Sequence, residues 1–181
     1  SDVCSSDLAM SKPASLNEFL CKQLNIYVSA NAAWVDRRHW DESVRSKPTD
    51  KPEATFLAFD LAHSRDLNAV VTLHRYGEED LWAKFMFFLP EESLGLIPNH
   101  YKSIFSQAVQ TGVLKLTPGN VTDLNEIEQY IKAECIAHNV KEIGYDPYNA
   151  AALVANLYAD GLPVKKVGQG MAVLSNPSKT A

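Results

Sequence analysis

A mainly apolar segment that ends close to a carboxylate is the feature that most restricts how this chain can fold. Residues 55–61 carry Asp60 near their end, and a polar turn with Asp66 leads into a second apolar segment at residues 68–75. A charge within an apolar strand costs free energy unless something compensates it, and a divalent metal ion can do so. The pattern therefore predicts two strands and makes Asp60 a candidate metal ligand.

Length and composition indicate a globular domain. The 181 residues suffice for one domain with a sizeable core and an appendage, and the apolar (46%) and charged (22%) fractions are ordinary. No apolar run approaches the roughly 18 residues of a membrane span. The N-terminus lacks a basic region followed by an apolar core, so we do not expect a signal peptide. Cys4, Cys21 and Cys135 are odd in number and widely spaced, which argues against disulfides and a cysteine zinc site and fits a reducing cytoplasm.

The net charge of −5 neither indicates nor excludes a nucleic-acid partner. Metal ligands in a nuclease add negative charge, and a local basic patch can still steer DNA to its site.

The N-terminal part differs from the rest of the chain. Residues 1–8 are small and polar without periodicity, and we interpret them as a cloning or assembly scar, with a disordered tail as the alternative. Residues 14–28 have apolar residues at spacings of three and four, which predicts one amphipathic helix. These apolar residues are Leu16, Phe19, Leu20, Leu24 and Val28.

An aromatic and basic stretch at residues 33–40 follows. We favour a connector whose two tryptophans pack on a domain; the alternative is a DNA-contacting patch with Arg37 and Arg38 on phosphates. Residues 43–53 are polar with two prolines and indicate a linker. The predicted organisation is a tail, a helical connector with its linker, and a compact domain, at residues 1–13, 14–53 and 54–181.

The compact domain is predicted to begin with strands and continue with alternating helices and strands. Residues 76–80 form a hairpin turn between two antiparallel strands, and Asp123 and Glu126 are expected to form a capping box for a helix. Early antiparallel strands followed by βαβ alternation predict an α/β fold, a mixed sheet flanked by helices. The predicted strands are residues 55–61, 68–75, 81–88, 113–116, 140–145 and 162–167; the predicted helices are 101–110, one beginning at 124, and 149–160.

Asp60 and Asp146 occupy equivalent places, each at the carboxyl end of a predicted strand. Functional sites in α/β sheets gather at such ends, and oxygen ligands suit Mg²⁺ or Mn²⁺. Two such ions about 4 Å apart can activate a water and stabilise the leaving oxygen of a phosphodiester. Asp66 could fold back to the same metal. The alternatives are that Asp66 is a turn former and that Asp146 caps the following helix.

Other polar residues give weaker signals. His63 and Arg65 are candidates for phosphate contact, although surface turn residues look the same, and Lys165 and Lys166 either meet DNA or form a solvated strand edge. Cys135 falls on the apolar face of a predicted helix, so we do not expect a nucleophile there. No phosphate-binding loop of the Walker type is present.

Several ordered sequence blocks resemble the large terminase subunits of tailed bacteriophages. Each block is unspecific alone, but their order and spacing from residue 16 to residue 179 are specific. The blocks are FLCKQLN at 19–25 with WV at 34–35, FDLA at 59–62 with RDLNAV at 65–70, LPEE at 89–92, GVLKLTPGN at 112–120, IGYDP at 143–147, and GQG at 168–170 followed by LS at 174–175.

The resemblance implies an RNase H-like nuclease domain preceded by the end of a packaging ATPase or its linker. It implies that Asp60 and Asp146 are catalytic metal ligands, with Asp66 close to the same Mg²⁺ or Mn²⁺, in an endonuclease acting on double-stranded phage DNA. The full-length protein is expected to work with a portal protein and a small terminase subunit in the cytoplasm of the infected bacterium, without a membrane.

Two departures from the family pattern matter. The ATPase motifs are absent, so this piece is not expected to translocate DNA. The chain also stops at Ala181, before a further acidic residue of the family, so we expect the fold to lack its C-terminal part and the isolated piece to cut weakly or not at all.

Two alternatives remain. The chain is a catalytically silent module that binds DNA or a portal protein, or it is another RNase H-like enzyme of the resolvase or transposase type. The stretch with Trp34 and Trp40 favours a terminase, because it resembles the remains of a preceding domain.

Overall fold

The computed structural model describes residues 37–62, 65–78, 80–170 and 173. Its contacts divide the chain into two units, residues 1–47 and 48–181. In the first unit the described residues contain the short helix α3 (Arg37–Glu42). The predicted helix at 14–28, the proposed scar, Cys4 and Cys21 lie outside the described residues, and the predicted domain boundaries stay predictions.

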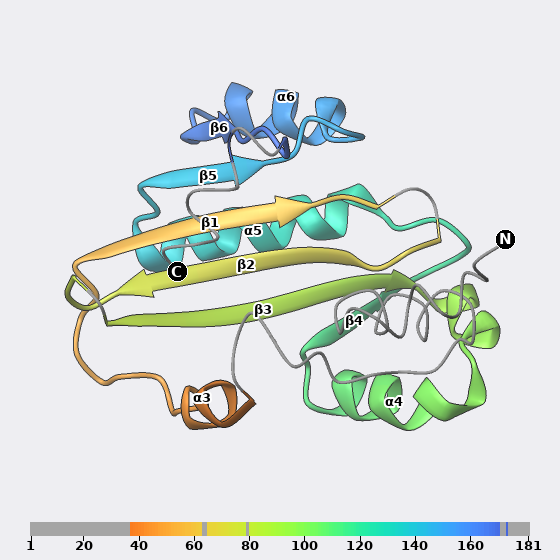
Figure 1. Ribbon diagram of the computed structural model, residues 1–181. Coiled ribbons are helices and arrows are strands. Elements are labelled where there is room, and N and C mark those ends of the chain that lie inside the picture. Colours follow the sequence, from red (N-terminus) through yellow and green to blue (C-terminus); the bar gives the residue numbers. More distant parts are fainter. Residues whose placement is uncertain (1–36, 63–64, 79, 171–172, 174–181) are drawn as a thin grey trace, which may run out of the picture. The chain divides into compact units, whose positions relative to one another are not determined.

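The second unit is built on a mixed six-stranded sheet in the order β4-β3-β2-β1-β5-β6 (Figure 1). Strands β1, β2 and β3 are antiparallel neighbours, whereas β4 joins β3, β5 joins β1, and β6 joins β5 in parallel. The predicted mixed sheet is therefore confirmed. The strands are β1 (Ala54–Asp60), β2 (Asn68–Arg75), β3 (Leu81–Pro90), β4 (Leu114–Thr117), β5 (Glu142–Tyr145) and β6 (Val164–Lys166).

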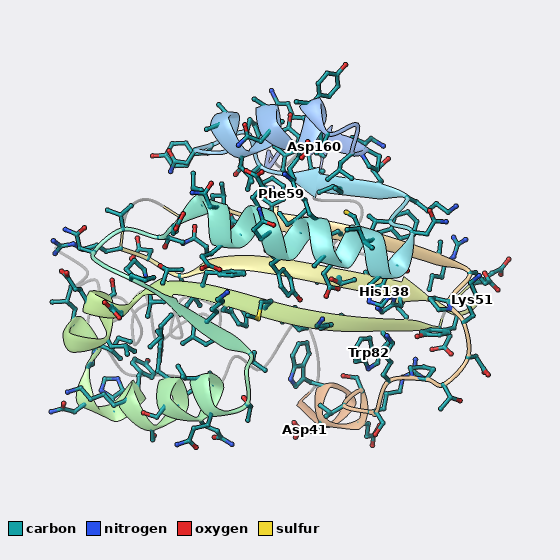
Figure 2. The ribbon with its side chains drawn as sticks, turned by 180° about the vertical axis from the view of Figure 1, so that it is seen from behind. Asp41, Lys51, Phe59, Trp82, His138 and Asp160 are labelled. Atoms are coloured by element: carbon teal, nitrogen blue, oxygen red, sulfur yellow. The ribbon has the colours of Figure 1, made fainter. Side chains whose placement is uncertain are left out.

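Helices α5 (Leu124–His138) and α6 (Ala151–Ala159) pack on one face of this sheet, and Figure 2 shows α5 in front of the strands. Helix α4 (Lys102–Gln110) contacts β4. The segment after β3 contains two short 3-10 helices, η1 (Glu91–Leu96) and η2 (Asn99–Tyr101). No helix among the described residues is long and apolar enough to cross a membrane.

The core lies between the sheet and helices α5 and α6. Ile127 and Ile131 of α5 are fully buried against Leu57 and Ile143 of the central strands. Burying an apolar side chain of this size stabilises the fold by about 1.5–3 kcal/mol. Cys135 is half-buried at the margin of this cluster, in keeping with its predicted place on the apolar face of the helix, and burial raises the pKa of its thiol.

The predicted start of α5 is correct, but its capping box is only half right. Asp123 is the N-cap, and its carboxylate accepts a hydrogen bond from the Asn125 N–H at 2.9 Å. Glu126 instead pairs with Lys115 of β4, at 2.5 Å between Nζ and Oε2. A tertiary ion pair has replaced the local contact that sequence spacing predicts.

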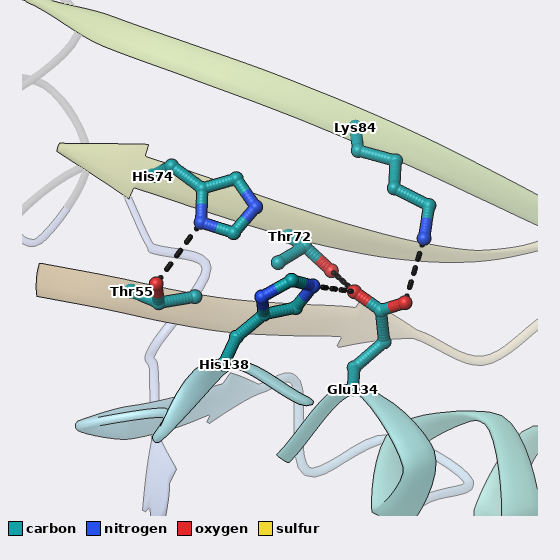
Figure 3. A network of polar contacts seen from close by, with 6 residues as sticks. All are labelled: Thr55, Thr72, His74, Lys84, Glu134 and His138. Carbon is teal, nitrogen blue, oxygen red and sulfur yellow. Dashed lines mark hydrogen bonds and ion pairs between the residues drawn. The ribbon is translucent and has the colours of Figure 1, made fainter. Parts of the chain in front are cut away.

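A buried carboxylate joins α5 to the sheet through a polar network (Figure 3). Glu134 is 6% exposed and accepts hydrogen bonds from Lys84 Nζ at 2.6 Å and Thr72 Oγ1 at 2.9 Å. His138 Nε2 lies 3.8 Å from the same carboxylate. Burial alone would raise the pKa of Glu134, but the bonds from Lys84 and Thr72 outweigh it and hold the pKa below its ordinary value.

The network continues to the start of β1. The rings of His74 and His138 meet edge to face with 4.7 Å between centroids, and His74 Nδ1 lies 3.0 Å from Thr55 Oγ1. These contacts tie the C-terminal half of α5 to the amino end of β1.

We expect Lys84→Met to lower the free energy of unfolding by about 2 kcal/mol, because it leaves the buried Glu134 carboxylate without its cation. Lys115→Met, which breaks an exposed pair on the next strand, should cost less than about 1 kcal/mol. Urea denaturation of both variants measures the difference, and equal losses would contradict the assigned role of Glu134.

The lowered pKa of Glu134 also predicts a pH dependence. A carboxylate whose folded pKa is depressed stabilises the fold above its ordinary pKa of 4.5, and this contribution disappears as pH falls through the lowered folded value. Glu134→Gln should therefore unfold at a lower temperature than the parent chain at neutral pH, with the gap closing below about pH 4.5. If the difference in unfolding temperature between the two chains stays constant across thermal scans at pH 3 to 7, the predicted pH dependence is wrong.

Candidate metal centre

Parallel pairing of β1 with β5 brings Asp60 and Asp146 to neighbouring positions. Phe59 pairs with Tyr145, and Asp60 and Asp146 are the residues that directly follow these two. Neighbouring strands lie about 4.8 Å apart, so the two carboxylates arise from adjacent points on the carboxyl edge of the sheet. Figure 1 shows the two strands running in the same direction. The predicted common placement of these two residues is thus seen in the backbone.

Two aromatic rings fix the register directly before the carboxylates. Phe59 is 4% exposed, and its ring stacks on that of Tyr145 with 5.9 Å between centroids and 12° between planes. A shift of one residue would carry Phe59 out of the core, so the alignment of the two aspartates is strongly specified.

Asp60 itself is exposed, unlike the residue before it. Water therefore already solvates its charge, and the expectation that this carboxylate needs a metal to offset burial does not hold. Its position beside Asp146 carries the argument for a metal instead.

Asp146 shapes the turn after β5. Its Oδ1 accepts a hydrogen bond from the Tyr148 N–H at 3.0 Å, and Asn149 adopts a left-handed conformation with φ of 56°. The N-cap of α6 is Ala150, without a side-chain cap bond, so Asp146 does not cap that helix. The backbone N–H orients the carboxylate at the edge of the sheet.

Asp66 and Arg65 lie between β1 and β2, and both are exposed. Their carbonyl oxygens accept hydrogen bonds from Asn68 Nδ2 and Ser93 Oγ, respectively. His63 lies outside the described residues. The two buried polar side chains that hold this loop were not singled out from the sequence.

Lys165 and Lys166 lie on β6, the edge strand beside β5, and both are exposed. Lys165 Nζ is paired with Glu142 Oε2 at 2.9 Å. A DNA phosphate would compete with this carboxylate for Lys165.

Within the described residues, no group of three or more histidine, cysteine, aspartate or glutamate side chains is arranged to hold a metal ion. Asp60, Asp66 and Asp146 therefore do not form a ready-made three-carboxylate cage. Mg²⁺ nevertheless keeps several waters and is commonly bound by one or two carboxylates together with substrate phosphates. Exposed Asp60 and half-buried Asp146 offer two carboxylates that fit that mode of binding.

A pocket of about 260 Å³ opens beside the carboxylate edge. Asn68, Thr122 and Asn149 supply its polar lining, and the rest is apolar. A larger pocket of about 360 Å³, which includes Thr55 and His138, lies at the opposite end of β1. Asp60 and Asp146 thus lie at the same end of the sheet as the smaller pocket.

The sheet order, the helices on its face and the strand-end carboxylates define an RNase H-like nuclease fold. The family model "Terminase large subunit, endonuclease domain" matches residues 5–181, and the chain belongs to this family. The resemblance seen in the sequence blocks is thereby confirmed.

Two relatives show the extent of the likeness. The chain is 27% identical over 175 residues to Protein YmfN of Escherichia coli (strain K12), covering 90% of this chain and 38% of YmfN. It superposes on the crystal structure of the HK97 bacteriophage large terminase with a TM-score of 0.70 and 21% identity, covering 97% of this chain and 37% of that protein. This second likeness shows the fold, and the chain spans well under half of either protein.

Proposed function

We propose that this chain is the metal-dependent endonuclease domain of a phage DNA-packaging terminase, hydrolysing phosphodiester bonds of double-stranded DNA with Mg²⁺ or Mn²⁺. The observation that carries the proposal is the alignment of Asp60 and Asp146 on parallel β1 and β5 in a chain of the terminase nuclease family. A two-metal arrangement is proposed, with both aspartates as ligands and Asp66 near the same ions.

The chain's own residues have distinct tasks in this scheme. Asp60 and Asp146 present oxygen atoms from adjacent strand ends, and the Tyr148 N–H keeps the Asp146 carboxylate oriented. Divalent ions held there would lower the pKa of water and offset the negative charge of the phosphodiester. Asp60 is exposed, so its carboxylate is accessible from solvent.

Basic side chains are proposed to position the DNA backbone. Arg65 and His63 follow Asp60 closely in the sequence, while Lys165 and Lys166 lie on the edge strand next to β5. Contacts of this kind to phosphates give orientation without reading the base sequence.

The complete terminase is proposed to supply the remaining activities. Residues 14–53 would connect this domain to a packaging ATPase, and the portal protein and small terminase subunit would be its partners in the cytoplasm of the infected bacterium. The lack of a three-residue metal group among the described residues favours one second candidate, a catalytically silent module that binds DNA or the portal.

Changes in the outer-shell partners of a metal weaken its binding by about 10–100-fold. We expect Asp60→Asn and Asp146→Asn each to weaken Mn²⁺ binding by more than this, because each removes a direct ligand. Calorimetric titration of the 181-residue chain with Mn²⁺ measures the affinity, and plasmid cleavage measures the activity.

Asp160→Asn is the matched control. It also removes one surface carboxylate, but Asp160 pairs with Lys132 at the end of α6, so Mn²⁺ affinity should not change. Unaltered affinity in both site variants would refute the metal centre, and a parent chain that binds no Mn²⁺ and cuts no DNA would support the silent module.

A further inference from the structure

The loop that carries Asp66 is held by two buried side chains that lie outside it. Asn68 opens β2 and is 3% exposed, and Ser93 belongs to η1 and is 5% exposed. Both bond to the main chain of the loop rather than to its side chains. The position of Asp66 therefore depends on residues that do not contact its carboxylate.

Asn68 makes three hydrogen bonds with its amide group. Its Oδ1 accepts from the Ala62 N–H at 3.0 Å, and its Nδ2 donates to the Asp66 carbonyl at 3.1 Å and to Thr122 Oγ1 at 2.8 Å. The backbone N–H of Ala62 must meet an acceptor and the Asp66 carbonyl a donor, so these partners dictate the orientation of the amide.

These bonds close the loop on itself and anchor it to α5. Ala62 follows the end of β1 and Asp66 precedes the start of β2, so one side chain joins both limbs of the loop. Thr122 is 8% exposed and directly precedes Asp123, the N-cap of α5. The same amide therefore links the Asp66 limb to the helix packed on the sheet.

Ser93 holds the loop from the other side. Its Oγ donates to the Arg65 carbonyl at 3.0 Å, one residue before the carbonyl that Asn68 binds. Consecutive carbonyl groups are thus fixed by donors from two different elements. A polar side chain that only closed a turn would not need the second donor.

We propose that Asn68, supported by Ser93, is a positioning residue that fixes the main chain at Arg65 and Asp66, so that the Asp66 carboxylate reaches a water bound to an ion held by Asp60 and Asp146. This inference rests on the proposed metal-dependent function. The carboxylate acts through a water of the ion, because the three aspartates form no metal-holding group among the described residues and because Mg²⁺ and similar ions retain waters. Fixing the loop beforehand spares the binding step the cost of ordering it.

A double-mutant cycle tests whether Asn68 acts through Asp66. We expect Asn68→Ala and Asp66→Asn each to weaken Mn²⁺ binding by about ten-fold, in the range of changes in outer-shell partners. Because both changes remove the same contribution, the double variant should bind Mn²⁺ no more weakly than either single variant. Calorimetric titration of the whole chain gives the affinities.

A second readout needs no metal. Amide hydrogen exchange at Asp66 and Leu67 should be faster in Asn68→Ala than in the parent chain, because the loop has lost its anchor. If Asn68→Ala does not fold, the same two measurements are made on Ser93→Ala and Asn68→Asp, because each of these variants removes only part of the hydrogen bonds that hold the loop.

Thr72→Val is the matched control. It deletes another buried hydrogen bond of β2, from Thr72 Oγ1 to Glu134, on the same face of the strand, but touches no loop residue. It should lower stability without changing Mn²⁺ affinity or loop exchange.

The outcomes separate this proposal from the function on which it rests. Parent-like Mn²⁺ binding by Asn68→Ala, or losses that multiply fully in the double variant, would overturn the positioning role while Asp60→Asn still loses the metal. A parent chain that binds no Mn²⁺ would overturn both.

Discussion

The parallel pairing of β1 with β5 is the constraint on which the rest of this structure depends. It stacks the half-buried ring of Tyr145 on the buried ring of Phe59 and, one residue later, brings Asp60 and Asp146 to the same edge. The apolar face and the polar edge are therefore specified together, because a register shift that moved the aspartates would also expose Phe59. Packing against α5 and α6 thereby positions carboxylates that those helices do not contact through any described bond.

Carboxylates have opposite environments at the two ends of the sheet. At the end near His74 and His138, Glu134 is buried and neutralised by Lys84, so its charge stabilises the attachment of α5. At the other end, Asp60 stays exposed and Asp146 accepts a bond from a backbone N–H rather than from a cation. A carboxylate that is paired with no cation among the described residues remains available to a diffusible one.

Much of the fold was predictable from local pattern, whereas the supports of the site were not. Strands at 55–61 and 68–75 follow from apolar runs separated by a polar turn, and the N-cap at Asp123 follows from residue type. The exposure of Asp60, the ion pair that Lys115 makes with Glu126 and the anchoring of the loop by Asn68 depend on segments distant in sequence. Within the candidate site, the placement of Asp60 and Asp146 at strand ends follows from local sequence pattern. Both members of the pair could therefore be predicted.

The strand order also has a consequence for how the domain folds. Strands β1, β2 and β3 are joined by short turns, so their pairing closes small loops and can occur early, whereas β1 meets β5 only after β4 and α5 have been made. On a ribosome, the antiparallel hairpins can form while β5, which Asp146 directly follows, is still being synthesised. The pairing of the two aspartates thus belongs to the slow, long-range stage of folding, and a nascent chain can hold most of its sheet without yet having a metal centre.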